Sequence, residues 1–352
     1  MKNNDLYELY IRSAKEGERY SEGSVVELNN CHLLIAYQEF LGGCSDFSPG
    51  RIAGMLSKDK GISWEDYSTI QENVADTNVM CPTLLRLQSD VLAHFYLHKN
   101  SVSDCQAYMT QSSDEGKSWG NSVRITAEQG YHVVNNDRVI QLKSGRLLVP
   151  VAHTPHCWCE QPWKSFCYFS DDNGSTWVVS DNKISLPKGY GTPTRDKIFG
   201  ALEPGVVELI DGRILMVIRT QLGHIYKSYS TDGGSTWTEA LPMSLVSPGA
   251  PSSIKRIPDT GDLLIIWNNN FDPEEFMCGR RCPLTAAISR DDGETWENIR
   301  NIETDESKDY AYTSITFLKE KVLLTYFTIP GAHAFTGGLS LKLKIIPVGW
   351  FY

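Results

Sequence analysis

The chain has 352 residues, 41% of them hydrophobic and 11% aromatic, with a formal net charge of −10. An acidic chain lacks the basic surface that nucleic acids and anionic membranes require, so we expect neither as a partner. No stretch approaches the roughly 18 apolar residues of a membrane-spanning helix, and the segment 1–20 lacks the apolar region of a signal peptide. Together with nine irregularly spaced cysteines, this predicts a cytoplasmic protein, unless a leader has been trimmed from the chain.

One segment of the pattern Ser-x-Asp-x-Gly-x-Ser/Thr-Trp recurs along the chain. Its copies are SKDKGISW from Ser57, SSDEGKSW from Ser112, SDDNGSTW from Ser170, STDGGSTW from Ser230 and SRDDGETW from Ser289. The closing tryptophans stand 55 to 60 residues apart, a period typical of one four-stranded propeller blade.

The residue types of this segment indicate a turn. The aspartate can accept backbone N–H bonds across the turn, the glycine supplies a positive φ, and the tryptophan has enough apolar area to pack between neighbouring sheets. A calcium or catalytic role for these aspartates is the competing interpretation. Each copy has too few carboxylates to enclose a cation, so we interpret the segments as structural.

A second repeated feature is a pair of β-rich runs joined by a polar turn. The pairs begin at Glu22, Cys81, Asn136, Glu203, Pro251 and Tyr312. Near-continuous Val, Ile and Leu favour strands buried on both faces. We call each Ser-x-Asp-x-Gly-x-Ser/Thr-Trp segment an Asp box. We therefore predict an all-β fold in which residues 1–352 form a single six-bladed β-propeller with five Asp-box hairpins. The first residue of each pair is expected at the mouth of the central channel, where propellers bind ligands.

Soft metal ligands gather at one place, His156-Cys157-Trp158-Cys159, with Cys167 nearby. Structural zinc sites need four ligands at regular spacing, and this segment does not supply them. We predict no metal and no cofactor.

The Asp-box segments, the six strand pairs and the run EPGVVELIDGR resemble the sialidase (neuraminidase) superfamily over essentially the whole chain. That resemblance implies a tyrosine nucleophile activated by a glutamate, an aspartate acid/base and three arginines that hold the substrate carboxylate. Tyr312 of YAYTSITFL is similar to the nucleophile, with Tyr310 as its rival. Glu203 of LEPGVVEL is similar to the activating glutamate, and Asp46 of FLGGCSDFSPGRIA falls in the acid/base loop.

Two of the family's three arginines also have counterparts. Arg219 follows the Glu203 strand pair, and Arg281 of RCPLTAAIS precedes the fifth Asp box, with Pro283 where the family has Asn. The implied reaction is release of a terminal, acidic sugar from a glycan with retention at the anomeric centre.

The family's first arginine belongs to an Arg-Ile-Pro at the start of the first inner strand, where this chain reads SEGSVVEL with Glu22. An anion beside the substrate carboxylate would cost roughly 1–4 kcal/mol at about 4 Å, depending on the local dielectric. Arg51 could substitute for the missing cation, or Glu22 could bind sugar hydroxyls. Further polar residues expected to contact a sugar are Asn136, Asp104 and Asn268.

Two other functions fit the same sequence. One is a propeller that binds glycans without cleaving them, which would have no need for Tyr312 and Glu203 within hydrogen-bond reach. The other is a glycosidase or lyase acting on a neutral or uronic sugar, with Glu22, Glu203 and Asp46 as acid and base. The sequence does not indicate an oligomeric state.

Overall fold

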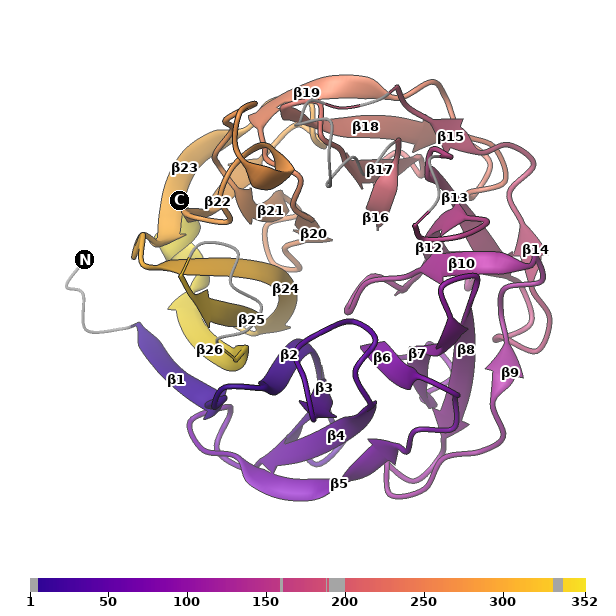
Figure 1. Cartoon of the computed structure of the whole chain (residues 1–352), viewed down its shortest axis with the longest axis vertical. Coiled ribbons are helices and arrows are strands. Elements are labelled where there is room, and N and C mark those ends of the chain that lie inside the picture. Colours follow the sequence, from indigo (N-terminus) through magenta and orange to yellow (C-terminus); the bar gives the residue numbers. More distant parts are fainter. Residues whose placement is uncertain (1–5, 159–160, 188, 190–199, 332–337) are drawn as a thin grey trace.

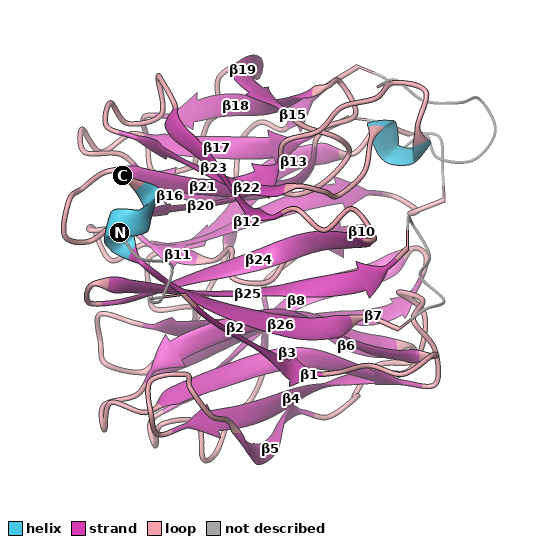
Figure 2. Cartoon of the chain, turned by 90° about the vertical axis from the view of Figure 1, so that its left-hand side faces the viewer, coloured by secondary structure: helices cyan, strands magenta, loops and turns pink. Residues whose placement is uncertain are grey.

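The structure, a computed structural model, describes residues 6–158, 161–187, 189, 200–331 and 338–352. Its regular elements are β-strands apart from two short 3-10 turns, η2 (Phe276–Cys278) and η3 (Val348–Phe351) (Figure 2). Among the described residues, no helix combines the length and apolar composition needed to cross a membrane. The predicted all-β fold is confirmed.

The strands form four sheets of four strands and one sheet of ten strands, arranged in a ring (Figure 1). The first sheet consists of β2 (Glu18–Glu27), β3 (Leu33–Leu41), β4 (Gly50–Ser57) and β5 (Glu65–Gln71). The sheet after the large one consists of β16 (Leu202–Glu208), β17 (Ile214–Arg219), β18 (His224–Ser230) and β19 (Leu241–Val246). The next consists of β20 (Ser253–Arg256), β21 (Leu263–Asn268), β22 (Leu284–Ser289) and β23 (Glu297–Glu303).

The ten-stranded sheet contains two of the predicted strand pairs. Its first part is β6 (Asn78–Arg86), β7 (Leu92–Ser101), β8 (Asp104–Ser112) and β9 (Val123–Arg124). Its second part is β10 (Gly130–Val133), β11 (Ile140–Gln141), β12 (Leu147–Thr154), β13 (Lys164–Ser170), β14 (Val178–Val179) and β15 (Ile184–Ser185). The parts are joined by parallel pairing of β8 with β10. The architecture is consistent with a propeller, and the count of six blades stays a prediction because these two units share one sheet.

The last sheet brings together distant parts of the chain. It contains β24 (Lys308–Leu318), β25 (Lys321–Pro330) and β26 (Ser340–Pro347), and its fourth strand is β1 (Tyr7–Arg12). β1 runs antiparallel to β26, with Tyr7 opposite Ile345. β1, the first described strand, is therefore the fourth strand of the sheet that β24, β25 and β26 form near the other end of the chain.

All five Ser-x-Asp-x-Gly segments form the same hydrogen-bonded turn. In the first, the Ser57 hydroxyl donates to Asp59 at 2.9 Å and accepts from the Gly61 N–H at 2.8 Å. The Asp59 carboxylate also accepts from the backbone N–H and the hydroxyl of Ser63, at 2.8 and 2.5 Å. The other four segments repeat this set of bonds.

The turns also attach each sheet to its neighbour. Gly61 has φ +93°, and an added Cβ would stand 2.9 Å from Leu323 of the last sheet. Trp64 packs in the hydrophobic cluster that holds Leu33 of its own sheet together with Leu323. Similar clusters fill the space between the other sheets. The predicted role of the tryptophans at the contacts between sheets agrees with this packing.

The innermost strands of four sequence units share a local irregularity. Each has a β-bulge, seen as a register shift between Ser21 and Ser24, Met80 and Thr83, Leu202 and Gly205, and Ala311 and Ser314. At each bulge one non-glycine residue has a positive φ: Glu22 (54°), Cys81 (58°), Glu203 (39°) and Tyr312 (58°). Left-handed residues of this kind cost of order 1–3 kcal/mol each and concentrate at functional sites. These are four of the six positions that the sequence places at the channel mouth.

Candidate active site

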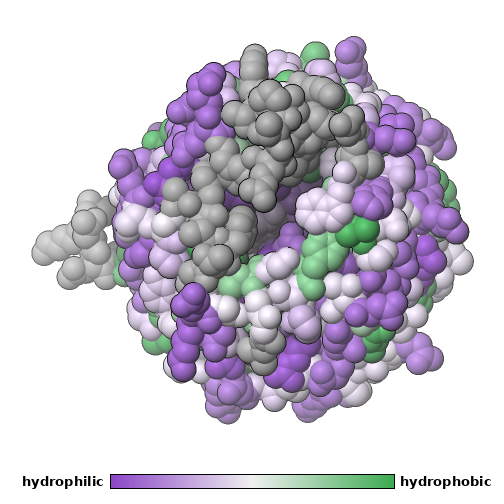
Figure 3. Space-filling model, in the orientation of Figure 1, coloured by the Kyte–Doolittle hydropathy of each residue, from purple (hydrophilic) through white to green (hydrophobic). Residues whose placement is uncertain are grey.

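A cavity of about 400 Å³ lies where the innermost strands of several sheets begin. Its wall contains charged residues from the first sheet, from the sheet of β16 to β19 and from the segment before β22, together with a group of aromatic residues. The face of the molecule seen in Figure 3 is hollowed near its centre. The lining residues include Arg19, Asp46, Phe47, Tyr131, Val133, Ala152, Trp158, Trp163, Glu203, Arg219, Met277, Arg281, Tyr312 and Phe327.

Tyr312 and Glu203, which are 109 residues apart in the chain, meet in this cavity. The phenol of Tyr312 donates a hydrogen bond to Glu203 Oε1 at 3.0 Å. The other oxygen of Glu203 accepts from Arg219, at the end of β17. Burial and the charge of Glu203 raise the pKa of Tyr312 above its usual value, and Arg219 and Arg281 act in the opposite direction. The phenol is therefore protonated at neutral pH, with a carboxylate placed to accept its proton.

Among the described residues, three guanidinium groups line the cavity. Arg219 pairs with Glu203, and Arg281 lies over the Tyr312 ring, 5.4 Å from its centroid. The third is Arg19 on β2, which is buried and bonded to Asp46 at 2.5 Å and to Glu22 at 2.9 Å. Arginine forms bidentate, charge-assisted hydrogen bonds to carboxylates, so the cavity is suited to an anionic ligand.

Asp46 lies on the loop between β3 and β4. Its side chain is 59% exposed, while its backbone carbonyl accepts from Lys99 Nζ at 2.7 Å and from Asn78 at 2.8 Å. Desolvation acts to raise the pKa of Asp46, but the charges of Arg19 and Lys99 outweigh it and hold the pKa at about 2. The loop is anchored by buried polar groups, and the carboxylate is ionised while it pairs with Arg19.

Aromatic rings form the wall near Asp46. Phe47 and Trp158 lie 5.7 Å apart between ring centroids, and Trp158 is 71% exposed. Tyr131 and Trp163 make an edge-to-face pair at 5.9 Å. Faces of this kind pack against the apolar side of a sugar ring while the charged groups bind its polar substituents.

Five of the ten site residues that the sequence predicted line this cavity: Tyr312, Glu203, Asp46, Arg219 and Arg281. Tyr310, the rival for the nucleophile position, is buried against Tyr326 and is not among the lining residues. The structure therefore favours Tyr312 over Tyr310.

The other five are not among the lining residues, and their hydrogen bonds explain why. Arg51 pairs with Glu39 at 2.7 Å, and Asp104 accepts from Asn100 at 2.8 Å and Gln106 at 3.1 Å. The amide groups of Asn136 and Asn268 donate to backbone carbonyls of Tyr312 and Tyr310, both at 3.1 Å. Contact of these four with a sugar stays a prediction, and the hydrogen bonds just given hold each of them to the protein outside the lining of the cavity. Asn136 instead supports the strand that carries Tyr312.

Glu22 differs most from its predicted role. It is 1% exposed, accepts from Arg19 at 2.9 Å and contacts the Cys81 thiol at 2.9 Å. Burial raises the pKa of Glu22 above its usual value. Because Arg19 and not Glu22 is among the lining residues, the expected repulsion between Glu22 and a bound carboxylate does not follow.

Sequence analysis missed Arg19. The triplet Arg19-Tyr20-Ser21 could have indicated it, since its first residue matches the arginine of the family's Arg-Ile-Pro and the other two do not. This arginine lies three residues before Glu22. The β-bulge between Ser21 and Ser24 shifts the strand register, so counting along a regular strand does not identify the lining residue. Of the HCWC segment, Cys157 and Trp158 line the cavity, and Cys159 lies outside the described residues.

The fold and site define an all-β protein of propeller type, with a Tyr–Glu pair surrounded by arginines. The chain belongs to the BNR repeat-like domain family, whose pattern matches residues 51–324. It is similar to a sialidase from Bacteroides fragilis, with 24% identity over 249 residues that cover 67% of this chain and 42% of the relative. It is also similar to a Clostridium perfringens sialidase, with 24% identity over 61% of this chain and 59% of the relative.

Solved structures agree on the fold. A Hadza microbial sialidase superposes with a TM-score of 0.75 at 17% identity, covering 97% of this chain and 68% of that one. Trypanosoma rangeli sialidase in complex with sialic acid superposes with a TM-score of 0.73 at 17% identity, covering 98% of this chain and 59% of that one. The chain thus spans about half the length of the curated sialidases to which it is similar.

Proposed function

We propose that this protein is a sialidase-like exo-glycosidase, built on a six-bladed propeller, that releases a terminal acidic sugar with retention. The observation that carries the proposal is the 3.0 Å hydrogen bond between Tyr312 and Glu203 inside a cavity lined by three arginines. The similarity to sialidases supports the same class of reaction.

Tyr312 would act as the nucleophile. A neutral phenol can approach an anomeric carbon that bears a carboxylate, whereas an ionised Asp or Glu would be repelled. As the Tyr312 oxygen bonds to the anomeric carbon, its proton passes to Glu203 and the bond to the leaving oxygen breaks. Arg219 and Arg281 lie beside the phenol and stabilise negative charge as it develops there.

Asp46 would donate the proton to the leaving oxygen. Water would later give a proton to Asp46 as it attacks the anomeric carbon, while the bond to the Tyr312 oxygen breaks and the phenol regains its proton from Glu203. With its pKa at about 2 it is ionised in the free protein, because it pairs with Arg19. A substrate carboxylate that binds Arg19 would compete with Asp46 for the same guanidinium. Loss of that pairing would raise the pKa of Asp46 and allow it to carry a proton, so that substrate binding itself prepares the acid.

The test is turnover of a panel of fluorogenic glycosides containing a sialoside, a uronide and neutral hexosides. We expect hydrolysis of the sialoside or of another acidic member, and loss of that activity in Tyr312→Phe. The matched control is Tyr310→Phe, which removes a hydroxyl from the same strand outside the cavity and should retain turnover.

Three outcomes would contradict the proposal in different ways. Turnover only of neutral sugars would reject an acidic substrate, and turnover that survives Tyr312→Phe would reject the nucleophile. Calorimetric binding of free sialic acid with no turnover of any panel member would instead indicate a glycan-binding protein. The buried Glu22 gives no support to a mechanism that uses it as acid or base.

A further inference from the structure

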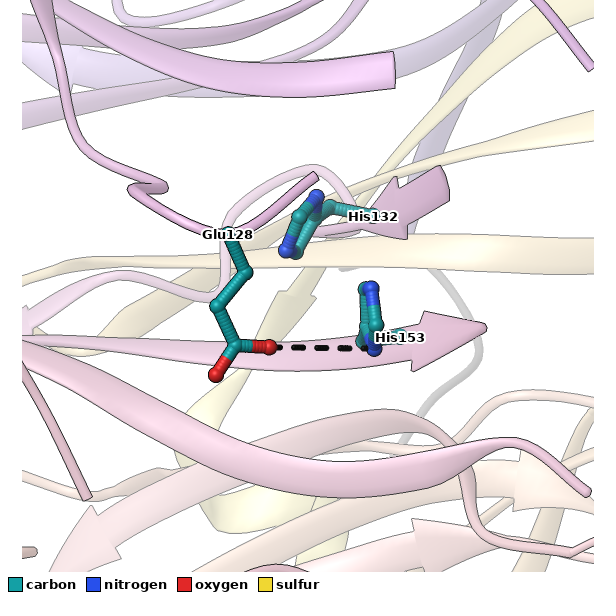
Figure 4. Close-up of side chains that lie close together, drawn as sticks. All are labelled: Glu128, His132 and His153. Atoms are coloured by element: carbon teal, nitrogen blue, oxygen red, sulfur yellow. Dashed lines mark ion pairs between the residues drawn. The ribbon is translucent and has the colours of Figure 1, made fainter. Parts of the chain in front are cut away.

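Three potential metal ligands meet behind the wall of the cavity: Glu128, His132 and His153 (Figure 4). His132 on β10 and His153 on β12 are directly opposite each other in the antiparallel pair, with ring centroids 4.5 Å apart. Glu128 comes from the segment just before β10. One candidate ligand atom from each residue lies within 4.8 Å of the other two.

Backbone carbonyls determine which nitrogen of each histidine is available. His132 Nδ1 lies 3.1 Å from the carbonyl oxygen of Cys105, and His153 Nε2 lies 2.9 Å from that of Gln129. A carbonyl only accepts, so these two nitrogens carry the hydrogens. The lone pairs therefore remain on His132 Nε2 and His153 Nδ1. Histidines that bind metals are commonly held this way, with the other ring N–H donated to a carbonyl.

The free nitrogen of His132 is an unusual group for a protein interior. His132 is 0% exposed, and its Nε2 has no hydrogen-bond partner among the described residues. A buried polar atom without a partner costs about 1–3 kcal/mol. One nitrogen of each ring donates its N–H to a carbonyl, which leaves the other nitrogen of a neutral ring with a lone pair, the form that ligates metals.

The ion pair drawn in Figure 4 does not explain why these three side chains lie together. His153 Nδ1 and Glu128 Oε2 are 4.0 Å apart, and their attraction requires a protonated imidazole. With a neutral ring, a lone pair faces a carboxylate oxygen. Three electron-pair donors thus lie within 4.8 Å of one another, and neither histidine places a hydrogen between them.

We propose that Glu128, His132 and His153 bind a divalent transition metal ion, with Zn²⁺ the best match. Two imidazole nitrogens and one carboxylate oxygen are a ligand set that Zn²⁺ favours, and a fourth position is left for water. A tetrahedral ion would hold the ligand atoms about 3.3 Å apart, so atoms now up to 4.8 Å apart would have to approach by up to about 1.5 Å.

Lys183 competes with the ion. Its Nζ lies 2.5 Å from Glu128 Oε2 and 4.4 Å from the centroid of the Phe166 ring. A metal would have to displace this ammonium from the carboxylate. Removing the lysine charge should therefore strengthen metal binding, which an unrelated surface site would not do.

The position of the group suggests what the ion would do. Side chains alternate along a strand, so Tyr131 and Val133 on β10 and Ala152 on β12 line the cavity while His132 and His153 point away from it. An ion would link β10 to β12 from behind and stiffen the wall that faces the proposed substrate. The chemistry of Tyr312 would not involve it.

The test uses the full chain, stripped with a chelator and titrated with Zn²⁺ by calorimetry and with Co²⁺ by visible absorption. We expect one equivalent to bind, with Co²⁺ giving ligand-field bands of a low-coordinate site and Zn²⁺ raising the melting temperature. Glu128→Gln and His153→Gln should each weaken binding about 10- to 100-fold, and Lys183→Met should tighten it. His98→Gln, outside the group, is the control.

Two results would overturn the proposal. One is the absence of stoichiometric binding in wild type and in Lys183→Met alike. The other is Co²⁺ binding that Glu128→Gln and His153→Gln leave unchanged. Tyr312→Phe should retain the metal, which separates failure of this site from failure of the proposed hydrolase function. Glu128 is partly exposed, so its variant keeps the test valid if substitution of the buried His132 prevents folding.

Discussion

The two ends of the sheets are built differently. In each unit with an Asp box, the turn follows the third strand and repeats one set of bonds within eight residues, as from Ser57 to Trp64. At the opposite end, where the first strands begin, the cavity takes different residues from different sheets, such as Arg19, Glu203 and Tyr312. The first end satisfies the serine and aspartate groups of its turns locally, and the second leaves charged groups to be satisfied by partners far along the chain.

This difference separates stability from function. At the Asp-box end, glycines such as Gly61 and Gly234 adopt positive φ readily, and four of the turns also place a non-glycine residue there: Lys60, Glu115, Asn173 and Asp292. The cavity end places Glu203 and Tyr312 in the same unfavourable region. We infer that substitutions at the first end chiefly lower the free energy of unfolding, and that substitutions at the second chiefly lower turnover or binding.

The largest effect is expected for Tyr312→Phe, with kcat reduced on the order of 10³-fold, as when other enzymes lose a nucleophile. The hydroxyl of Tyr312 donates to Glu203 within the cavity, and its loss leaves the backbone pairing of β24 with β25 unchanged. The melting temperature should therefore stay within about 2 °C of wild type. Parallel kinetics and calorimetric unfolding check this prediction. A large drop in melting temperature would contradict the inference that residues at the cavity end affect turnover and not stability.

Gly234→Ala tests the other end. Gly234 has φ +89°, and an added Cβ would stand 2.5 Å from Leu148 of the preceding unit. Left-handed strain and overpacking together should lower the free energy of unfolding by roughly 2–4 kcal/mol. Urea denaturation measures it, with Gly212→Ala as the control, because Gly212 has φ +86° but nothing within 4 Å of the added atom. Equal losses in the two variants would show that contact with the neighbouring sheet is unimportant.

Arg281→Met should chiefly weaken substrate binding. Its guanidinium lies over the Tyr312 ring and faces the cavity, and a charge-assisted hydrogen bond contributes about 1.5–3 kcal/mol. We expect KM for an acidic substrate to rise about 10- to 100-fold. KM for a neutral glycoside, if one is cleaved, should change little. A rise of the same size for both would mean that Arg281 shapes the cavity without recognising charge.

The smallest effect concerns acid stability. Hydrogen bonds from the hydroxyl and backbone N–H of Ser63, Ser118 and Thr176 lower the pKa of Asp59, Asp114 and Asp172 to about 2. A depressed folded-state pKa adds stability that is present above about pH 4 and is lost as the pH falls toward 2. Asp114→Asn should flatten this pH dependence of urea unfolding. Asp76→Asn, an exposed aspartate outside the turns, should leave it unchanged, and identical curves for both would contradict the assignment.

The Asp-box turns could be predicted from sequence because every group they need lies within eight residues. Tyr312 and Glu203 were found because each begins a strand pair and matches a family motif. Arg19 could not be found in this way, since the bulge after Ser21 breaks the two-residue alternation that assigns side chains to faces.

The predicted site residues that do not line the cavity show the same limit of sequence analysis. Asn136 stands at the predicted channel mouth, but its amide group donates hydrogen bonds to the backbone carbonyls of Gly23 and Tyr312. The pairing of His132 with His153 depends on the register of β10 against β12, which no local pattern specifies. What a side chain binds is therefore fixed by tertiary register more than by its place in the repeat.

The pairing of β1 with β26 has a consequence for synthesis of the chain. Tyr7 is synthesised before its partner Ile345, which follows more than three hundred residues later in the chain. Until then the edge of β1 has no native partner, and the last sheet cannot form. Because contacts so distant in sequence slow folding, completion of the ring should be a late event in folding.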